Sequence, residues 1–193
     1  PPIPGDSPED EFRAWDAMLA AKNISSTDIT FALPRRNWAN GTVYDMYQHN
    51  YSATTTATSA ATNLYDSTFY FMTSDLRVYK VLDNNAGAAY NGAEPTSTSN
   101  SPVAIGGYII KYMYTITQSE ASKFLTTDFM PVSTDSTVSA AATDGAIESL
   151  KVTGGSSYTD GTYYAAVYGD GSNQGTSSGA IVRITVSSGS IVS

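Results

Sequence analysis

The sequence contains no cysteine, so disulfide bonds and cysteine-ligated metal centres are both excluded. It has a single histidine, and charged residues make up 15% of the chain, compared with about a quarter in typical soluble proteins. No apolar run approaches the ~20 residues that a membrane-spanning helix needs. The formal net charge is −8, which would repel a phosphate backbone. We therefore expect neither a nucleic-acid partner nor a membrane partner.

Apolar residues make up 41% of the 193 positions, enough to form a buried core. Ser, Thr, Gly, Asn and Tyr take the place of the missing charges, a mixture typical of β-rich surfaces that contact other proteins. We predict an α+β, β-rich fold. A mixed α/β region over residues 1–132, with a β-hairpin and a Tyr-rich strand, would be joined through a linker at 133–144 to a smaller all-β domain at 145–193.

The strongest helix signal follows an extended, proline-rich arm at residues 1–7. Ser7 fits an N-cap, Pro8 the first helical position, and Asp10 the acidic position of a capping box. We predict a helix over residues 8–22. Its apolar face would consist of Phe12, Trp15, Met18 and Leu19. This face is apolar enough to require a partner that covers it.

Several segments predict strands. A short strand is expected over residues 28–32 and is ended by Pro34. A hairpin is expected over 68–83, with its turn at 73–75. The strongest strand signal covers 108–116, an aromatic and amphipathic segment. Alternation places five of its residues on one face: Tyr108, Ile110, Tyr112, Tyr114 and Ile116.

Other segments predict loops and a second short helix. Residues 52–62 are Ser, Thr and Ala without an apolar period, and 84–102 form a long polar loop. Ser119 is expected to cap a helix that runs to residue 125. Near the C-terminus, Gly-Ala-Ile at 145–147 recurs at 179–181. This repeat predicts two similar strands around a hairpin through the Gly-rich stretch 169–179.

Motifs for catalysis or metal binding are weak. His49 lies in a polar stretch with no nucleophile motif around it, so we interpret it as a loop residue. The pairs Asp160-Gly161 and Asp170-Gly171 resemble calcium loops, but the later ligand positions lack carboxylates, and turns explain both pairs better. We therefore assign no catalytic residue, no cofactor and no metal ligand, and we expect a protein that is not an enzyme.

Five residues are candidate interface anchors: Arg35, Arg36, Trp38, Tyr108 and Tyr112. Arg, Trp and Tyr dominate the energetic hot spots of protein interfaces. For the two arginines and Trp38, the alternative is a structural ion pair and a packed indole. For the tyrosines of the 108–116 strand, the alternative is a place in the core, which we favour.

The segment Leu33-Pro34-Arg35-Arg36-Asn37-Trp38 resembles the PRR-x-W segment of a baseplate wedge subunit of T-even-type contractile-tailed bacteriophages, the wedge protein encoded by gene 8. Four other motifs resemble that family in the same order. They are the Pro1-Pro2, Pro4, Asp6-Ser7, Trp15 and Met18 spacing; Tyr79 with Leu82-Asp83; Gly107-Tyr108 with Tyr112 and Ile116; and Met130-Pro131-Val132. The resemblance covers residues 1–132. Residues 133–193 are more similar to the Gly/Ser-rich β repeats common in phage structural proteins.

This resemblance implies an α/β region interrupted by an all-β domain. It also implies a location in the tail baseplate of the virion and a homodimer within each wedge that contacts the other wedge subunits. Such subunits hold the baseplate together and remodel it during host attachment. The family's N-terminal part has no counterpart here and the chain begins without Met, so we expect a fragment.

Two other functions are compatible with the same residues. A carbohydrate-binding adhesin or tail-fibre-tip module would use Tyr-rich strands and Asn/Asp loops to stack on sugars and to bind their hydroxyl groups. A glycan hydrolase would require two carboxylates that converge at ~5–10 Å.

Overall fold

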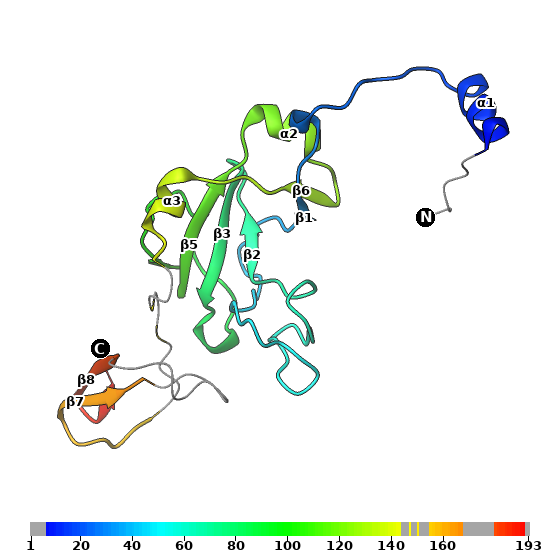
Figure 1. Ribbon diagram of the computed structural model, residues 1–193. Helices are drawn as coiled ribbons and strands as arrows, with labels where there is room; N and C mark the ends of the chain where they lie inside the picture. Colours follow the sequence, from blue (N-terminus) through cyan, green and yellow to red (C-terminus); the bar gives the residue numbers. More distant parts are fainter. Residues whose placement is uncertain (1–6, 144–146, 148–149, 151–154, 168–179, 192–193) are drawn as a thin grey trace. The chain divides into compact units, whose positions relative to one another are not determined.

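A computed structural model describes residues 7–143, 147, 150, 155–167 and 180–191 (Figure 1). The chain divides into two compact units, Pro1–Ala146 and Ile147–Ser193. The described residues contain three α-helices and nine strands, and the strands form three antiparallel sheets. This confirms the predicted α+β, β-rich fold. None of the helices described is both long and apolar enough to span a lipid bilayer.

The first unit contains a four-stranded sheet with the order β2-β3-β5-β4 and a two-stranded ribbon of β1 and β6. Its strands are β1 (Ala32–Pro34), β2 (Tyr70–Met72), β3 (Arg77–Asp83), β4 (Val103–Ile105), β5 (Tyr108–Thr115) and β6 (Phe129–Pro131). Its helices are α1 (Pro8–Asp16), α2 (Gln118–Phe124) and α3 (Ser136–Ala141), with 3-10 turns η1 (Ser26–Asp28) and η2 (Asn85–Gly87). In Figure 1, β2, β3 and β5 lie side by side in this sheet.

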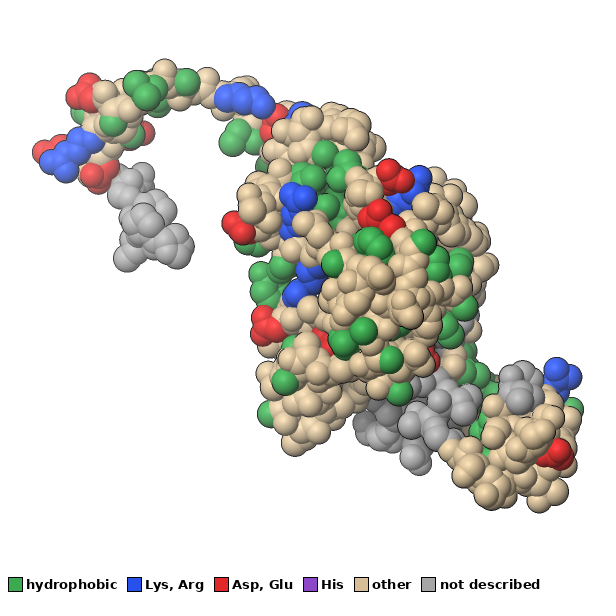
Figure 2. Space-filling model, turned by 180° about the vertical axis from the view of Figure 1, so that it is seen from behind, with side chains coloured by type: hydrophobic (Ala, Val, Ile, Leu, Met, Phe, Trp, Pro, Cys, Tyr) green, Lys and Arg blue, Asp and Glu red, His purple; other side chains and the backbone are tan. Residues whose placement is uncertain are grey.

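The helix α1 begins as predicted, because Ser7 is its N-cap. The Ser7 Oγ accepts the Asp10 backbone N–H at 3.2 Å and donates to the Asp10 carboxylate at 2.7 Å. The helix ends at Asp16, six residues earlier than predicted. No residue of α1 is buried, so no packing contact stabilises further turns. Figure 2 shows hydrophobic and acidic side chains exposed together on α1 and on the residues that follow it.

The predicted hairpin is confirmed as β2 and β3. The two strands pair Tyr70 with Lys80, Phe71 with Tyr79 and Met72 with Val78. The loop between them covers residues 73–76, one residue longer than the predicted turn. Leu76 adopts a φ of +62°, a left-handed conformation that is unfavourable for any residue other than glycine. The Thr73 N–H donates to Arg77 O at 2.9 Å and closes the loop.

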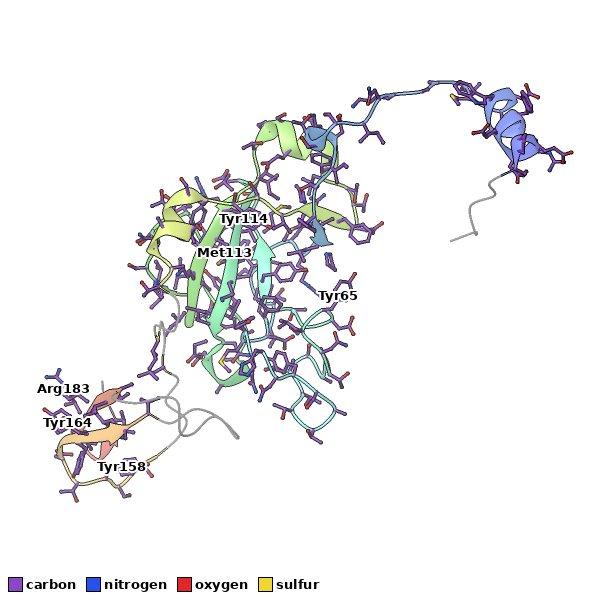
Figure 3. The ribbon with its side chains drawn as sticks, in the orientation of Figure 1. Tyr65, Met113, Tyr114, Tyr158, Tyr164 and Arg183 are labelled. Carbon is purple, nitrogen blue, oxygen red and sulfur yellow. The ribbon has the colours of Figure 1, made fainter. Side chains whose placement is uncertain are left out.

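The prediction that five residues of the 108–116 segment share one face is wrong. Val78 of β3 pairs with Tyr114, but the next residue, Tyr79, pairs with Tyr112, so Met113 is an extra residue in β5 (Figure 3). This β-bulge reverses the alternation of the strand. Residues of β5 before the bulge therefore enter one core, whereas those after it enter another. The first group is Tyr108, Ile110 and Tyr112, and the second is Tyr114 together with Ile116, which directly follows the strand.

The two cores lie on opposite faces of the four-stranded sheet. Phe71 of β2 packs in the first core, and its neighbours Tyr70 and Met72 pack in the second, as the alternation of a strand requires. The first core consists of Tyr44, Phe71, Tyr79, Val81, Tyr90, Tyr108, Ile110, Tyr112 and Val138. The second consists of Tyr70, Met72, Val78, Tyr114, Ile116 and Met130. Tyrosine thus forms much of the interior.

Two segments predicted as irregular contribute to the first core. Residues 84–102 form a loop, as predicted, but Tyr90 within it is fully buried and donates its hydroxyl to Ala93 O at 2.8 Å. The predicted linker 133–144 contains α3, and Asp135 caps this helix by accepting from two backbone N–H groups. Val138 of α3 is buried, so the ordered part of the first unit extends beyond residue 132.

The short elements near residues 28 and 119 also differ from prediction. The predicted strand over 28–32 is replaced by η1, and β1 instead begins at Ala32 and includes Pro34. Pro34 is tolerated because it lies at the end of a two-stranded ribbon. The predicted second helix is present as α2, but its N-cap is Thr117, which forms a capping box with Glu120.

The second unit is a three-stranded sheet with the order β7-β8-β9. Its strands are β7 (Gly161–Ala166), β8 (Ile181–Ser187) and β9 (Ser190–Ile191). Ile181 of the second repeat copy begins β8, as predicted. However, β8 pairs with β7, whereas the sequence predicted pairing with the strand that contains the copy at 145–147. Most of that first copy, the stretch 169–179 and Asp170-Gly171 lie outside the described residues. Asp160 accepts the Gly189 N–H at 2.9 Å, which ties the start of β7 to the β8–β9 turn.

A substitution at the β4–β5 turn tests how closely Tyr90 is packed. Gly106 has a φ of +61°, and a Cβ at this position would lie 2.6 Å from the Tyr90 ring. Gly106→Ala is therefore expected to lower the free energy of unfolding by about 2–3 kcal/mol in urea titrations followed by fluorescence. Gly107→Ala is the matched control, because its φ is also positive but the nearest atom lies 3.2 Å away on Asn85. Equal losses for the two variants would contradict close packing against Tyr90.

Candidate functional site

The segment Arg35–Trp38 runs along the outer edge of β2. The Met72 N–H donates to Arg36 O at 2.7 Å, and the Trp38 N–H donates to Met72 O at 2.8 Å. Asn37 and Met72 form a parallel bridge between these two bonds. The segment therefore covers the β2 edge, which would otherwise expose unpaired backbone groups. This pairing fixes the backbone from which three of the candidate anchors project.

The two arginine side chains bind backbone carbonyl groups within the first unit. Arg35 donates to Thr126 O at 2.9 Å, next to β6. Arg36 donates through one nitrogen to Tyr65 O at 3.2 Å and to Asp66 O at 3.0 Å, and its guanidinium lies 5.4 Å from the centre of the Tyr70 ring. Both side chains are half-buried. They join segments distant in the sequence, which supports the alternative that the two arginines are structural. Instead of the ion pair of that alternative, they form hydrogen bonds to backbone carbonyl groups.

The Trp38 side chain is also half-buried. Its indole packs edge-on against Tyr90, with ring centres 5.9 Å apart, at the margin of the first core. Among the described residues, its Nε1 and the Nε of Arg36 are buried without a hydrogen-bond partner. Trp38 therefore supports the fold whether or not a partner chain contacts its exposed part, and its role as an interface anchor stays a prediction.

Tyr108 and Tyr112 are not surface anchors, because they are only 1% and 6% exposed. The Tyr108 hydroxyl donates to Ala88 O at 2.6 Å and accepts the Tyr44 N–H at 3.1 Å. Burial raises the pKa of Tyr108 above its usual value, so its hydroxyl keeps its proton at neutral pH. The core alternative, which the sequence analysis favoured for this strand, is confirmed.

Two pockets flank the Leu33–Trp38 segment. The first has a volume of about 270 Å³ and is lined by Arg35, Asn37, Trp38, Met72, Thr73, Ser74, Leu76 and Glu94. Glu94 in this pocket accepts from the Ser74 N–H at 2.6 Å and from the Ser74 Oγ at 2.7 Å, so its carboxylate holds the β2–β3 turn. The second, here called the aromatic pocket, also has a volume of about 270 Å³. It is lined by Leu33, Pro34, Leu64, Tyr65, Phe69 and Tyr70.

A larger pocket, of about 560 Å³, lies in the second unit and is here called the hairpin pocket. It is lined by Ser157, Tyr158, Thr159, Tyr163, Ile184, Val186 and Ile191. Tyr158 and Tyr163 are each close to half exposed, and the Tyr163 hydroxyl donates to Thr159 O at 2.9 Å. The pocket thus combines two accessible rings with an aliphatic floor. Figure 3 shows Tyr158 beside the β7–β8 hairpin.

Among the residues that the structure describes, strongly exposed apolar side chains are most numerous over residues 7–31, here called the arm. Six of its large apolar side chains are more than 60% exposed: Phe12, Trp15, Leu19, Ile24, Ile29 and Phe31. The sequence predicted that the helical part of this surface would require a cover. In the described chain the helix face stays uncovered. Such a concentration of exposed apolar groups is typical of interaction surfaces.

The sequence analysis missed a buried acidic residue, Asp45, which is 0% exposed. Its carboxylate accepts from the N–H and hydroxyl of Ser59, at 2.7 and 2.6 Å, and from the same two groups of Thr68, at 2.7 and 3.0 Å. Burial alone would raise the pKa of Asp45, but these four bonds outweigh it and hold the pKa below the ordinary 3.8. Asp45 thereby holds the Ser/Thr/Ala stretch at Ser59 through contacts within the chain.

The remaining titratable candidates do not converge. His49 lies exposed in a loop of the first unit, as predicted. In the part of the chain that the structure describes, no group of three or more His, Cys, Asp or Glu side chains is placed to hold a metal ion. The candidate site is therefore a set of contact surfaces: the arm, the two pockets beside the Leu33–Trp38 segment, and the hairpin pocket. No protein-family model, curated protein or solved structure matches this chain.

Proposed function

We propose that the chain is a structural subunit of a phage tail baseplate wedge, acting through interfaces that hold and remodel the baseplate during host attachment. A role in assembly is supported by the exposure of the arm: six large apolar side chains within residues 7–31 are more than 60% exposed. A protein that works alone in water rarely exposes so much apolar surface in one segment.

The assignment to a baseplate rests on a second argument, the resemblance of five ordered motifs in residues 1–132 to the wedge family. The partners proposed are the other wedge subunits and a second copy of this chain, in the tail baseplate of the virion. The proposed action is non-enzymatic and needs no cofactor.

The arm has physical properties that suit assembly. Its helix has only nine residues, and a helix of this length is marginal in water without tertiary contacts. Docking would therefore order the helix and bury its apolar face in one step. A permanent contact between wedge subunits is expected to bury ~2,000 Å² or more. Remodelling would require two packings of these interfaces with similar free energies.

Incorporation into particles tests this proposal. Tail particles would be assembled with the unaltered chain or with a Phe12→Glu/Trp15→Glu variant, and the chain would be quantified in the purified particles. We expect the unaltered chain to be found beside other tail proteins, and the variant to be incorporated at least about tenfold less because charges replace two anchors of the apolar face.

The matched control for this experiment is Tyr164→Glu, which changes an equally exposed ring, 71% accessible, in the second unit. Circular dichroism of each purified variant would establish that it is folded. The proposal would be refuted if the unaltered chain were absent from particles, or if the arm variant were incorporated as well as the control.

The hairpin pocket favours a second candidate function, a carbohydrate-binding adhesin or tail-fibre-tip module. Tyr158 and Tyr163 present accessible rings on which a sugar could stack, and Ser157 and Thr159 offer hydroxyl groups beside them. A glycan array probed with the purified chain would discriminate between the two functions. Specific binding that Tyr158→Ala abolishes would favour the adhesin, whereas no binding would leave the assembly role as the better account.

A further inference from the structure

The apolar face of α1 and the aromatic pocket are both uncovered in the isolated chain. Trp15 is 67% exposed and Phe12 is 70% exposed, and these residues lie three positions apart on one helix face. We infer that two copies of the chain exchange arms, with Trp15 of each copy bound in the aromatic pocket of the other and Phe12 packed beside its opening. This inference rests on the proposed role as an assembly subunit and identifies one of its partners.

The shape and chemistry of the aromatic pocket fit an aromatic side chain. All six lining residues are apolar or aromatic, and the volume of about 270 Å³ admits one large ring. Phe69 is held between two neighbours, with ring centres 5.0 Å from Tyr70 and 5.3 Å from Tyr47, so this wall is ordered before binding. Tyr65, 63% exposed, bounds the opening and would be covered by an incoming ring (Figure 3).

The charges around the helix and around the pocket are complementary. Within Pro8–Asp16 the helix carries four acidic side chains and one basic side chain: Glu9, Asp10, Glu11 and Asp16, with Arg13. At the pocket, Arg36 lies over the Tyr70 ring and Lys80 lies 4.2 Å from the centre of the Tyr47 ring. Asp66, whose backbone carbonyl accepts from Arg36 at 3.0 Å, is the acidic residue beside them. The rim therefore has more positive than negative groups, and an acidic helix would be attracted to it.

Two observations favour a second copy over the chain's own arm. In the isolated chain Trp15 stays exposed and the pocket stays open, so the chain's own helix does not fill it. The arm also leads directly into β1, whose Leu33 and Pro34 line the pocket. Each arm therefore departs beside the site that it would fill on the other copy, and a twofold exchange forms the same contact twice.

Trp15 fluorescence tests the exchange directly. The chain has two tryptophans, so Trp38→Phe leaves Trp15 as the sole indole. As protein concentration rises, its emission is expected to shift to shorter wavelength and to become protected from iodide, while light scattering reports conversion of monomer to dimer. Tyr65→Asp, which removes one pocket wall and repels the acidic helix, is expected to raise the dimer dissociation constant at least about tenfold. The control Tyr164→Asp is expected to leave it unchanged.

Disulfide capture gives a second measurement that does not alter Trp38. Because the chain has no cysteine, Phe12→Cys combined with Tyr65→Cys places one thiol on the helix and one at the pocket of each copy, and the two single variants serve as controls for 12–12 and 65–65 disulfides. Exchange predicts covalent dimers on non-reducing gels. An internal disulfide in a monomer, or a blue shift independent of concentration, would show that the arm binds its own pocket and would overturn the proposal. A monomer with Trp15 exposed at every concentration would also overturn it, while incorporation into particles would still support the assembly role.

Discussion

Replacing Tyr108 by alanine is expected to lower the free energy of unfolding by about 5 kcal/mol, a large share of the total stability of a typical domain. Tyr108 is 1% exposed and lies edge-on to Tyr44 and Tyr90, with ring centres 6.3 and 5.4 Å away. The substitution removes these contacts and leaves a cavity between the sheet and the loops that cover it. It also leaves the Tyr44 N–H and the Ala88 carbonyl without their hydroxyl partner.

The variant Tyr108→Phe separates the ring from the hydroxyl. Phenylalanine keeps the packing but loses both hydrogen bonds, so we expect a loss of about 1–2 kcal/mol. Urea unfolding, followed by circular dichroism and by fluorescence, would measure both variants. The interpretation would be wrong if alanine and phenylalanine destabilised the protein equally, because the ring would then contribute no packing energy.

Local signals in the sequence predicted several elements correctly. Ser7 and Pro8 identified the start of α1, because an N-cap and a first-turn proline act within four residues. The β2–β3 hairpin followed from two β-prone runs around a polar turn. The fold class was therefore accessible from composition and periodicity alone. The end of α1 was not, because it depends on the absence of packing, which no local pattern reports.

The β5 strand shows why the arrangement of the core was not predictable. Regular alternation places Tyr112 and Tyr114 on the same face, and every residue of the segment fits that pattern. The bulge at Met113 results from pairing with β3, where Val78 and Tyr79 face opposite cores. The position of the bulge therefore depends on pairing with a strand that is 30 or more residues away in the sequence. The same holds for Val138, whose helix appears in the sequence as a polar linker.

The candidate site was predicted in part. The sequence identified Arg35, Arg36 and Trp38 as unusual, and the structure places all three at the β2 edge between two pockets. The sequence did not indicate that both arginines bind carbonyl groups of distant loops. Asp45 was missed because its four donors come from Ser59 and Thr68, and Ser and Thr are common throughout the chain. A lone acid in a neutral segment followed by a Ser/Thr stretch is the pattern that could have revealed it.

The second large effect concerns Asp45, where we expect Asp45→Asn to lower the free energy of unfolding by about 3 kcal/mol at pH 7. The carboxylate accepts four hydrogen bonds in a fully buried position. An asparagine amide replaces one acceptor oxygen by a donor, which would face the N–H and hydroxyl donors of Ser59 or Thr68. In either orientation of the amide, at least one buried backbone N–H, that of Ser59 or that of Thr68, would lose its acceptor. The loops that Asp45 joins, from Tyr44 to Thr68, would loosen together.

The same residue predicts a dependence of stability on pH. The pKa of Asp45 is lower in the folded protein than its ordinary value of 3.8 in an unfolded chain. Its contribution is therefore fully present above that ordinary value and is lost as the pH falls through the lower, folded-state pKa. We expect the difference in unfolding free energy between the unaltered chain and Asp45→Asn to be largest near neutral pH and to shrink below pH 3.8.

Comparison with a second acid-to-amide change isolates this effect, because Asp28, Glu120 and Asp160 also have lowered pKa values and contribute to any acid transition. Asp66→Asn is suitable, since Asp66 is exposed and a surface substitution of this kind is expected to cost less than about 0.5 kcal/mol. Urea titrations at a series of pH values would compare the two variants with the unaltered chain. If Asp45→Asn lost no more stability than Asp66→Asn, or if its deficit stayed constant into acid, the buried carboxylate would not be the charged centre that holds these loops.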